Sequence, residues 1–508
     1  MSTRGRSAVA GLACAAVAIG VAELAAAVVT PASAPVVAVG AAVITFTPEP
    51  VKEFAIAVFG VYDKLALVAG IGLILAIIAA VIGVACARRP WIGYGGLAGF
   101  GLLGVVAAVT RPGSSPWWAL PSLIGVLAAM LALRLVFRRR VALDGPETAR
   151  PPVPGRDVDR RGVLIGFGVA GVAGLAGWRV GGTDDIERIR STIELPRARS
   201  VGPSAVGKAL DVKGITPYLT DTANDGFYRI DTALTLPRID PGKYRLRIGG
   251  RVAEPLSLSY QELLDLPLVE REITLSCVSN EVGGELAGTA RWLGVPLKDL
   301  LDMVKPDAGA DQIVGRSADG WTCGTPTKVC SDGRDAMLAV GMDGEPLPIR
   351  HGFPVRMLVP GLYGYVSATK WLVELELSSF DDFDAYWVRR GWDAEAPIKT
   401  FSRIDTPTAT KRVKPGRTPV AGIAWAQRRG IGAVEVRVDD GDWREAELAP
   451  VISTDTWRQW VLAWDATPGR HRLEVRATDE SGDTQPEKRV TPFPNGATGW
   501  HSVLVNVE

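Results

Sequence analysis

Two short segments in the second half of the chain hold the residues whose types and spacing could do chemistry. Cys277 stands in the run Thr-Leu-Ser-Cys-Val-Ser-Asn-Glu, at the end of a stretch that predicts a β-strand. A cysteine binds metals as its thiolate, although a lone cysteine is more often a buried structural residue. The second segment, Arg350-His-Gly-Phe-Pro-Val-Arg356, adds an imidazole and two guanidinium groups. Because a guanidinium presents a planar fork of donors to phosphate oxygens, these segments suit a metal site beside a bound anion.

A third motif, Gly288-Thr-Ala-Arg-Trp292, lies between them, and the three together resemble the sulfite oxidase family of molybdenum–pterin enzymes. The resemblance implies a molybdenum–molybdopterin cofactor with Cys277 as the metal ligand, since a soft thiolate suits a metal that has other sulfur ligands. It also implies that His351 and Arg356 bind the pyranopterin and its phosphate. The cofactor would supply the redox chemistry, and the protein would supply ligand, orientation and electrostatics.

The resemblance names further residues that would contact the pterin. Lys370 matches a lysine that grips the phosphate in relatives, but it stands one position later than in sulfite oxidases. Asn224 belongs to an Asn…Phe-Tyr motif similar to one of the periplasmic sulfoxide-reductase branch, with one extra residue before Phe227. The complete set of these candidates is Asn224, Tyr228, Arg229, Thr322, Ser367 and Lys370.

Other positions depart from the sulfite oxidase pattern. Where the family carries a catalytic tyrosine, the run Trp-Val-Arg-Arg-Gly-Trp-Asp has Trp392, whose indole donates a hydrogen bond but cannot relay a proton. Arg229-Ile-Asp-Thr stands where an anion-binding Arg-Asn-His run is expected, and Arg458 is the arginine that the last domain would lend to the pocket. A sulfite dianion requires several cationic or N–H donors, so these departures argue against sulfite as the substrate.

Composition argues against other redox centres. The chain has three histidines, none before residue 350, so its apolar first part offers no histidine ligand for a haem. Five cysteines without a CxxC pair argue against an iron–sulfur cluster, and no flavin fingerprint is visible. Cys323 and Cys330 could form a disulfide or remain two buried thiols. A net charge of +1 gives no indication of a nucleic-acid partner.

Residues 1–181 are apolar and predict a membrane domain. Their long apolar runs predict five transmembrane helices, each of ~20 residues, at 7–29, 64–86, 91–109, 117–137 and 163–181. The stretch 34–47 is too short for a span and stays unassigned. Arginines cluster before the first, after the second, after the fourth and before the fifth run. By the positive-inside rule, the N-terminus is cytoplasmic and the rest of the chain is extracytoplasmic.

Arg160 and Arg161 precede the fifth apolar run and resemble an internal twin-arginine export signal. Such a signal moves folded domains across a membrane, which suits a domain that receives its cofactor in the cytoplasm. The alternative is that both are ordinary positive-inside residues.

The rest of the chain predicts two domains. Irregular strands and short helices over 182–405 predict an α+β molybdopterin domain. Recurring strand patterns over 406–508 predict an all-β sandwich that resembles the immunoglobulin-like dimerisation domain of sulfite oxidases, which implies a homodimer.

We therefore predict a membrane-anchored molybdopterin oxidoreductase that transfers an oxygen atom to or from a small molecule. Its electrons would pass through a cytochrome, a quinone-linked protein, or quinol bound by the membrane helices. One alternative is a sulfoxide or N-oxide reductase fed by quinol. Another is a non-catalytic, membrane-anchored binding module with a degenerate pocket. A transporter is disfavoured because the apolar runs lack charged pairs.

Overall fold

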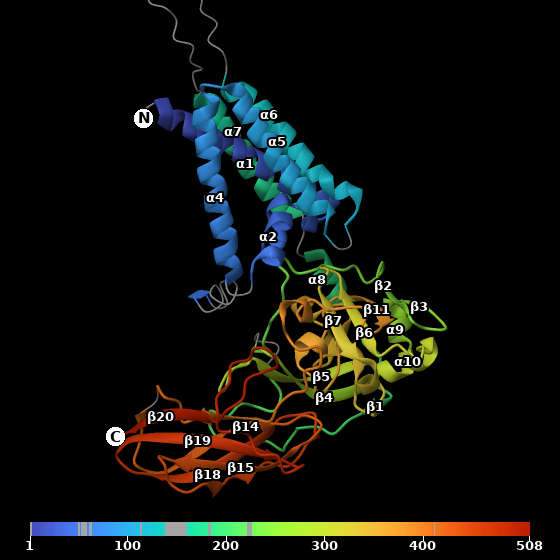
Figure 1. Cartoon of the computed structure of the whole chain (residues 1–508), viewed down its shortest axis with the longest axis vertical. Helices are drawn as coiled ribbons and strands as arrows, with labels where there is room; N and C mark the ends of the chain where they lie inside the picture. Colours follow the sequence, from blue (N-terminus) through green and yellow to red (C-terminus); the bar gives the residue numbers. More distant parts are fainter. Residues whose placement is uncertain are drawn as a thin grey trace, which may run out of the picture. The chain divides into compact units, whose positions relative to one another are not determined.

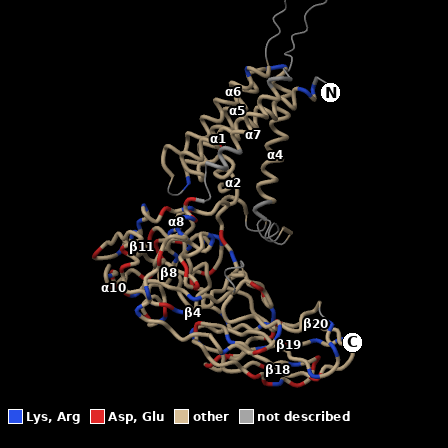
Figure 2. Tube along the Cα trace, turned by 180° about the vertical axis from the view of Figure 1, so that it is seen from behind, with Lys and Arg blue, Asp and Glu red and all other residues tan. Residues whose placement is uncertain are grey.

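A computed structural model describes residues 3–48, 51, 58–59, 63–111, 114–137, 160–180, 184–220, 226–410 and 412–508. The chain forms two compact units (Figure 1). The first consists of Met1–Asp185 with Thr232–Leu236, and the second consists of Ile186–Asp231 with Pro237–Glu508. Lysine, arginine, aspartate and glutamate are frequent in the second unit and sparse on the helices of the first (Figure 2).

The first unit is built from apolar helices. They are α1 (Thr3–Val29), α2 (Pro35–Phe46), α4 (Asp63–Cys86), α5 (Pro90–Val109), α6 (Leu120–Val136) and α7 (Arg160–Val180). Small residues let them approach closely: a Cβ on Gly11 of α1 would lie 2.2 Å from the Ala79 carbonyl oxygen of α4. Helices α1, α2, α4, α5 and α6 also line a cavity of about 190 Å³.

Four stretches are long and apolar enough to cross a membrane, by length and composition: Arg4–Val29, Ala66–Cys86, Pro90–Val109 and Pro116–Val136. They coincide with the first four predicted spans. The fifth predicted span forms α7, whose described apolar part, Val163–Gly174, is shorter than a span. A fifth crossing therefore stays a prediction, and the unassigned stretch 34–47 forms α2.

The second unit begins with two sheets and short helices. The first sheet has the order β1-β4-β5-β8-β10, with β9 paired to β8, and the second has the order β3-β2-β11-β6-β7. The first sheet contains β1 (Ser200–Val201), β4 (Val269–Ser276), β5 (Ala287–Pro296), β8 (Met337–Met342), β9 (Glu345–Pro346) and β10 (Arg356–Leu358). The second contains β2 (Arg245–Gly250), β3 (Leu256–Ser259), β6 (Gln312–Ser317), β7 (Thr322–Pro326) and β11 (Leu372–Ser378). The helices are α8 (Asp184–Ser191), α9 (Tyr260–Leu264) and α10 (Leu297–Val304).

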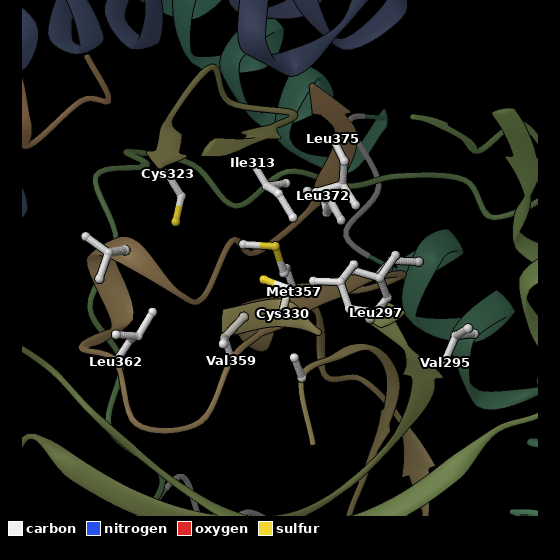
Figure 3. Packing of buried hydrophobic residues seen from close by; sticks show 14 of the residues in the cluster. Val295, Leu297, Ile313, Cys323, Cys330, Met357, Val359, Leu362, Leu372 and Leu375 are labelled. Atoms are coloured by element: carbon white, nitrogen blue, oxygen red, sulfur yellow. The ribbon is translucent and has the colours of Figure 1, made fainter. Parts of the chain in front are cut away.

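One apolar core joins these two sheets. Ile313 of β6, Met357 of β10 and Leu372 at the start of β11 belong to the same buried cluster and lie close together (Figure 3). Helix α9 is held in place by a capping box, in which Ser259 and Glu262 satisfy each other's backbone N–H groups. This α+β arrangement matches the predicted class.

Two further sheets form the C-terminal part, as the recurring strand patterns predicted. One has the order β12-β14-β18-β17 and the other β13-β20-β19-β15-β16. Their bounds are β12 (Phe401–Thr406), β13 (Arg412–Val413), β14 (Gly416–Trp425), β15 (Ile431–Val438), β16 (Arg444–Glu445), β17 (Glu447–Leu448), β18 (Arg458–Ala466), β19 (Gly469–Asp479) and β20 (His501–Val507).

These sheets enclose a second core around Trp460 and Val475. The predicted domain boundary at 405/406 falls inside β12, which pairs with β14. The sheets therefore begin at Phe401, a few residues earlier than predicted. The immunoglobulin-like character and the homodimer stay predictions.

Candidate functional site

Cys277 follows directly on β4, in a loop that is fixed by its own hydrogen bonds. Its N–H donates to the Leu286 carbonyl at 2.9 Å, and its carbonyl accepts from the Asn280 N–H at 3.1 Å. The Asn280 side chain in turn accepts from the Leu286 N–H at 2.8 Å. Burial raises the pKa of the Cys277 thiol, while Ser279 and Lys370 act to lower it. A nearby cation, above all a metal, would stabilise the thiolate.

Three basic residues that were predicted from the sequence to bind the cofactor lie close together and are buried. His351 ends a short 3₁₀ turn, Arg356 opens β10, and Lys370 stands just before β11. The Arg356 guanidinium donates to the His351 carbonyl at 3.3 Å and lies 5.2 Å from the centre of the Trp292 ring. Lys370 pairs with Asp231, Nζ to Oδ2, at 3.0 Å.

Gly352 allows the two segments of this cluster to meet. Its φ of 116° is in a region that favours glycine. A Cβ at this position would lie 3.1 Å from Lys370 Cα and 3.2 Å from Arg356 Cβ. The glycine of the His-Gly-Phe-Pro-Val-Arg motif therefore serves the close approach of the two chain segments.

The cluster carries an excess of positive charge. Burial, followed by the cations of Arg356, Lys370, Arg350 and Arg229, lowers the pKa of His351 to about 3, so its imidazole is neutral at neutral pH. Burial also lowers the pKa of Lys370 to about 8, against the opposing effect of Asp231, and that of Arg356 to about 10. These cations, beside the Asp231 carboxylate, suit a phosphate group.

Buried polar groups that lack hydrogen-bond partners indicate whether a cofactor fits here. Within the part of the chain that the structure describes, His351 Nε2 and Arg356 Nε are buried and have no hydrogen-bond partner. Leaving such a group unsatisfied costs about 1–3 kcal/mol, so a polar ligand in contact with them would be stabilising. A thiol, an imidazole, a guanidinium and an ammonium group fit a molybdenum bound to a phosphorylated pterin.

Tyr228 and Arg229 lie at the same cluster. Tyr228 stacks on Phe227, and Phe227 packs edge-on against His351 with ring centres 5.5 Å apart. Burial, with a smaller effect of Cys277, raises the pKa of Tyr228, and Arg356 opposes this. Arg229 is partly exposed and pairs with Asp231 at 2.9 Å. Asn224 lies outside the described residues, so its role stays a prediction.

Ser367 and Thr322 use their hydroxyl groups locally. Ser367 donates to the carbonyls of Leu362 and Tyr363, each at 3.0 Å. Thr322 accepts from the N–H of Tyr386 at 3.0 Å. These hydrogen bonds hold loops in place. That Ser367 and Thr322 contact the cofactor stays a prediction.

Trp392 and Arg458 lie in different surroundings. Trp392 packs between Tyr365, Trp387 and Phe493, with the Tyr365 ring centre 5.8 Å away. Arg458 donates from Nε to the Ala449 carbonyl at 2.7 Å and from Nη1 to the Ile431 carbonyl at 2.8 Å. The Arg458 guanidinium therefore binds backbone carbonyls of the C-terminal part, and its predicted place in the pocket stays a prediction.

Sequence reasoning missed Asp231 and Tyr363. Asp231 bridges Lys370 and Arg229, and its place two residues after Arg229 could have suggested this ion pair. The Tyr363 hydroxyl is buried, and burial raises its pKa, with a smaller raising effect of Cys277 and an opposing effect of the Lys399 backbone. No local pattern marks this tyrosine. The sequence left open whether Cys323 and Cys330 form a disulfide or remain thiols. In the structure both are free, buried thiols.

Comparison with known proteins shows which proteins the chain resembles. Residues 233–387 match the family model described as the oxidoreductase molybdopterin binding domain. The chain is 30% identical to the sulfite oxidase of Gallus gallus over 324 residues, which is 53% of this chain and 69% of that protein. It is also 30% identical to the mitochondrial sulfite oxidase of Mus musculus over 343 residues, which is 54% of this chain but only 59% of that protein.

A solved structure shares the fold. The sulfane dehydrogenase SoxCD of Paracoccus pantotrophus superposes with a TM-score of 0.50 at 21% identity, over 64% of this chain and 95% of that chain. At this identity the likeness concerns the fold alone.

Proposed function

The chain belongs to the sulfite oxidase family of molybdopterin-dependent oxidoreductases, and on this premise we propose that it transfers an oxygen atom to or from a small molecule. One observation carries the proposal: Cys277 lies near a buried cationic cluster in which, among the described residues, His351 Nε2 and Arg356 Nε have no hydrogen-bond partner. Retention of these residues also speaks against a degenerate binding module.

Each residue has a distinct part in this proposal. The bound cofactor would supply a metal that changes its oxidation state by two electrons. Cys277 would bind that metal through its thiolate, and Arg356 and Lys370 would bind the phosphate. His351, kept neutral by burial and by neighbouring cations, would offer an imidazole nitrogen to the pterin. Burial of these groups would strengthen their electrostatic contacts with the cofactor.

A sulfoxide or N-oxide is the second candidate substrate. Two observations favour it over sulfite: Arg458 is engaged by backbone carbonyls, and Trp392 brings no phenol. A neutral oxide needs fewer cationic donors than a dianion. Sulfite oxidation measured beside sulfoxide and N-oxide reduction, in membranes that contain the protein, distinguishes the two.

We also propose that the first unit anchors the chain in a membrane, with the second unit on the extracytoplasmic face. The four apolar stretches and the arginine distribution support this. The lining of the cavity in the first unit is apolar apart from Ser122 and the thiols of Cys14 and Cys86. The proposed electron partner is an external cytochrome or a quinone-linked protein, with quinol bound by the membrane helices as the alternative.

Metal and pterin analysis of the purified chain tests the proposal. We expect one molybdenum per chain in the wild type, loss of molybdenum in Cys277→Ser, and retention in Cys330→Ser, a matched control at another buried free thiol. Wild-type protein without molybdenum, made in a host that synthesises the cofactor, would overturn the proposal.

A further inference from the structure

The strand that delivers Cys277 is held by the C-terminal part of the chain. The Thr274 N–H donates to the Asp455 carbonyl at 2.9 Å, and the Thr274 hydroxyl accepts from the Trp457 N–H at 2.9 Å. The Gln427 side-chain amide donates to the carbonyls of both Thr274 and Asp455. Thr274 stands three residues before Cys277, whereas Gln427 follows β14 and Trp457 precedes β18.

The chain after Cys277 is held by the same C-terminal part. Arg403 of β12 donates from Nη1 to the Gly284 carbonyl at 2.7 Å. A Cβ on Gly283 would lie 2.4 Å from the His501 ring, so this loop packs directly on that imidazole. His501 is itself fixed, since its Nδ1 accepts from the Ile404 N–H at 3.0 Å. The C-terminal part thus contacts the chain on both sides of Cys277.

The contacts on the strand before Cys277 are buried, so a change in one of them can shift the residues that follow. Thr274, Gln427, Asp455 and Trp457 are each at most 5% exposed. In a close-packed interior, a displaced strand moves the residues that follow it. Groups that orient a ligand, without touching the metal, tune metal geometry in proteins.

We propose that Gln427 and Arg403 are positioning residues, through which the C-terminal part sets the place of the Cys277 sulfur. The inference rests on the proposed role of Cys277 as the metal ligand. It gives the C-terminal part a task beyond the dimerisation that the family resemblance implies. Gln427 acts on the strand before the thiol, and Arg403 acts on the loop after it.

Gln427→Leu removes both side-chain hydrogen bonds at nearly constant volume. Its matched control is Gln485→Leu, because Gln485 is also buried and its side chain binds Gly499, Ala477 and the Ser402 hydroxyl rather than Thr274. Two readouts apply to the full chain: the electron paramagnetic resonance spectrum of the pentavalent molybdenum state, and the alkylation rate of Cys277 in cofactor-free protein, read by peptide mass spectrometry.

We expect Gln427→Leu to shift the resonance spectrum and to change the alkylation rate by at least roughly fivefold, the size expected for each of the two buried hydrogen bonds that it removes. Gln485→Leu should leave both unchanged. Unchanged values in Gln427→Leu, or equal changes in both variants, would overturn the proposal. If Gln427→Leu does not fold, Arg403→Met carries the same test. The alkylation assay needs no metal, so a failure of the proposed function would be seen separately, as absent molybdenum in the wild type.

Discussion

Lys370 has the most readily tested charge in the site. It is buried against Asp231, and burial lowers its pKa to about 8 while the carboxylate partly opposes this. The folded protein therefore loses this charge as pH rises through about 8, whereas an unfolded lysine keeps it to ~10.4. Between these two values, the unfolded chain binds more protons than the folded one. Anion binding should weaken over the window in which Lys370 is neutralised.

We predict that cofactor-free protein binds sulfate less tightly as pH rises through about 8, because the Lys370 ammonium is lost there. Sulfate keeps a constant charge over this range, so the titration reports the protein. Calorimetric titration from pH 6.5 to 9.5 measures the effect at roughly half-unit steps. Lys370→Arg should remove the slope, because a guanidinium stays charged. An equal slope in that variant would show that another group is responsible.

At the scale of elements, the approach of β10 and β11 depends on Gly352. The His-Gly-Phe-Pro-Val-Arg motif turns there at φ 116°, against Lys370 and Arg356. A side chain would be both strained and crowded at this position. The glycine thus connects a local backbone conformation to the assembly of the cationic cluster.

We predict that Gly352→Ala lowers the free energy of unfolding by about 1–3 kcal/mol and lowers molybdenum content. The matched control is Gly333→Ala, where φ is 93° and a Cβ would meet nothing within 4 Å. That variant should cost about 1–2 kcal/mol through the backbone alone, less than Gly352→Ala, and retain molybdenum. Chemical denaturation followed by tryptophan fluorescence gives the difference. Equal losses in both variants would refute a role for crowding at Gly352.

At the scale of the whole molecule, an apolar helical unit and a charged unit rich in β-sheet are joined in one chain (Figure 2). If the second unit receives its cofactor in the cytoplasm and works outside, it must cross the membrane folded. Arg160 and Arg161 stand where α7 begins, directly before the apolar stretch. An arginine pair directly before an apolar helix has the arrangement of a twin-arginine export signal.

We predict that Arg160→Lys combined with Arg161→Lys leaves residues 182–508 on the cytoplasmic side, because a twin-arginine signal requires arginine rather than charge alone. Protease accessibility in intact spheroplasts measures the exposed fraction. The control is Arg138→Lys combined with Arg139→Lys, a second arginine pair outside the signal. Normal outward display of the first variant would mean that the pair acts only through its charge.

Much of the architecture could be predicted from local patterns. These patterns follow from hydrophobic periodicity and backbone requirements, which are local. They are the apolar runs of membrane-spanning length, the period-two strand patterns in the last hundred residues, and the motifs around Cys277 and His351. The family, the cofactor class and the order of helical, α+β and all-β parts were confirmed. The roles of single residues at the site stay predictions.

Only the tertiary structure decided which distant side chains meet. Gln427 binds Thr274 across 153 residues of sequence, and Lys370 pairs with Asp231 across 139. Arg458 sits in a sequence context that favoured the pocket, yet its guanidinium is held by backbone carbonyls of the C-terminal sheets. Sequence by itself determined the elements and the reactive residue types, because these depend on near neighbours along the chain. The partners of each buried polar group depend on how sheets pack, since such a group binds whichever donor or acceptor that packing brings within reach.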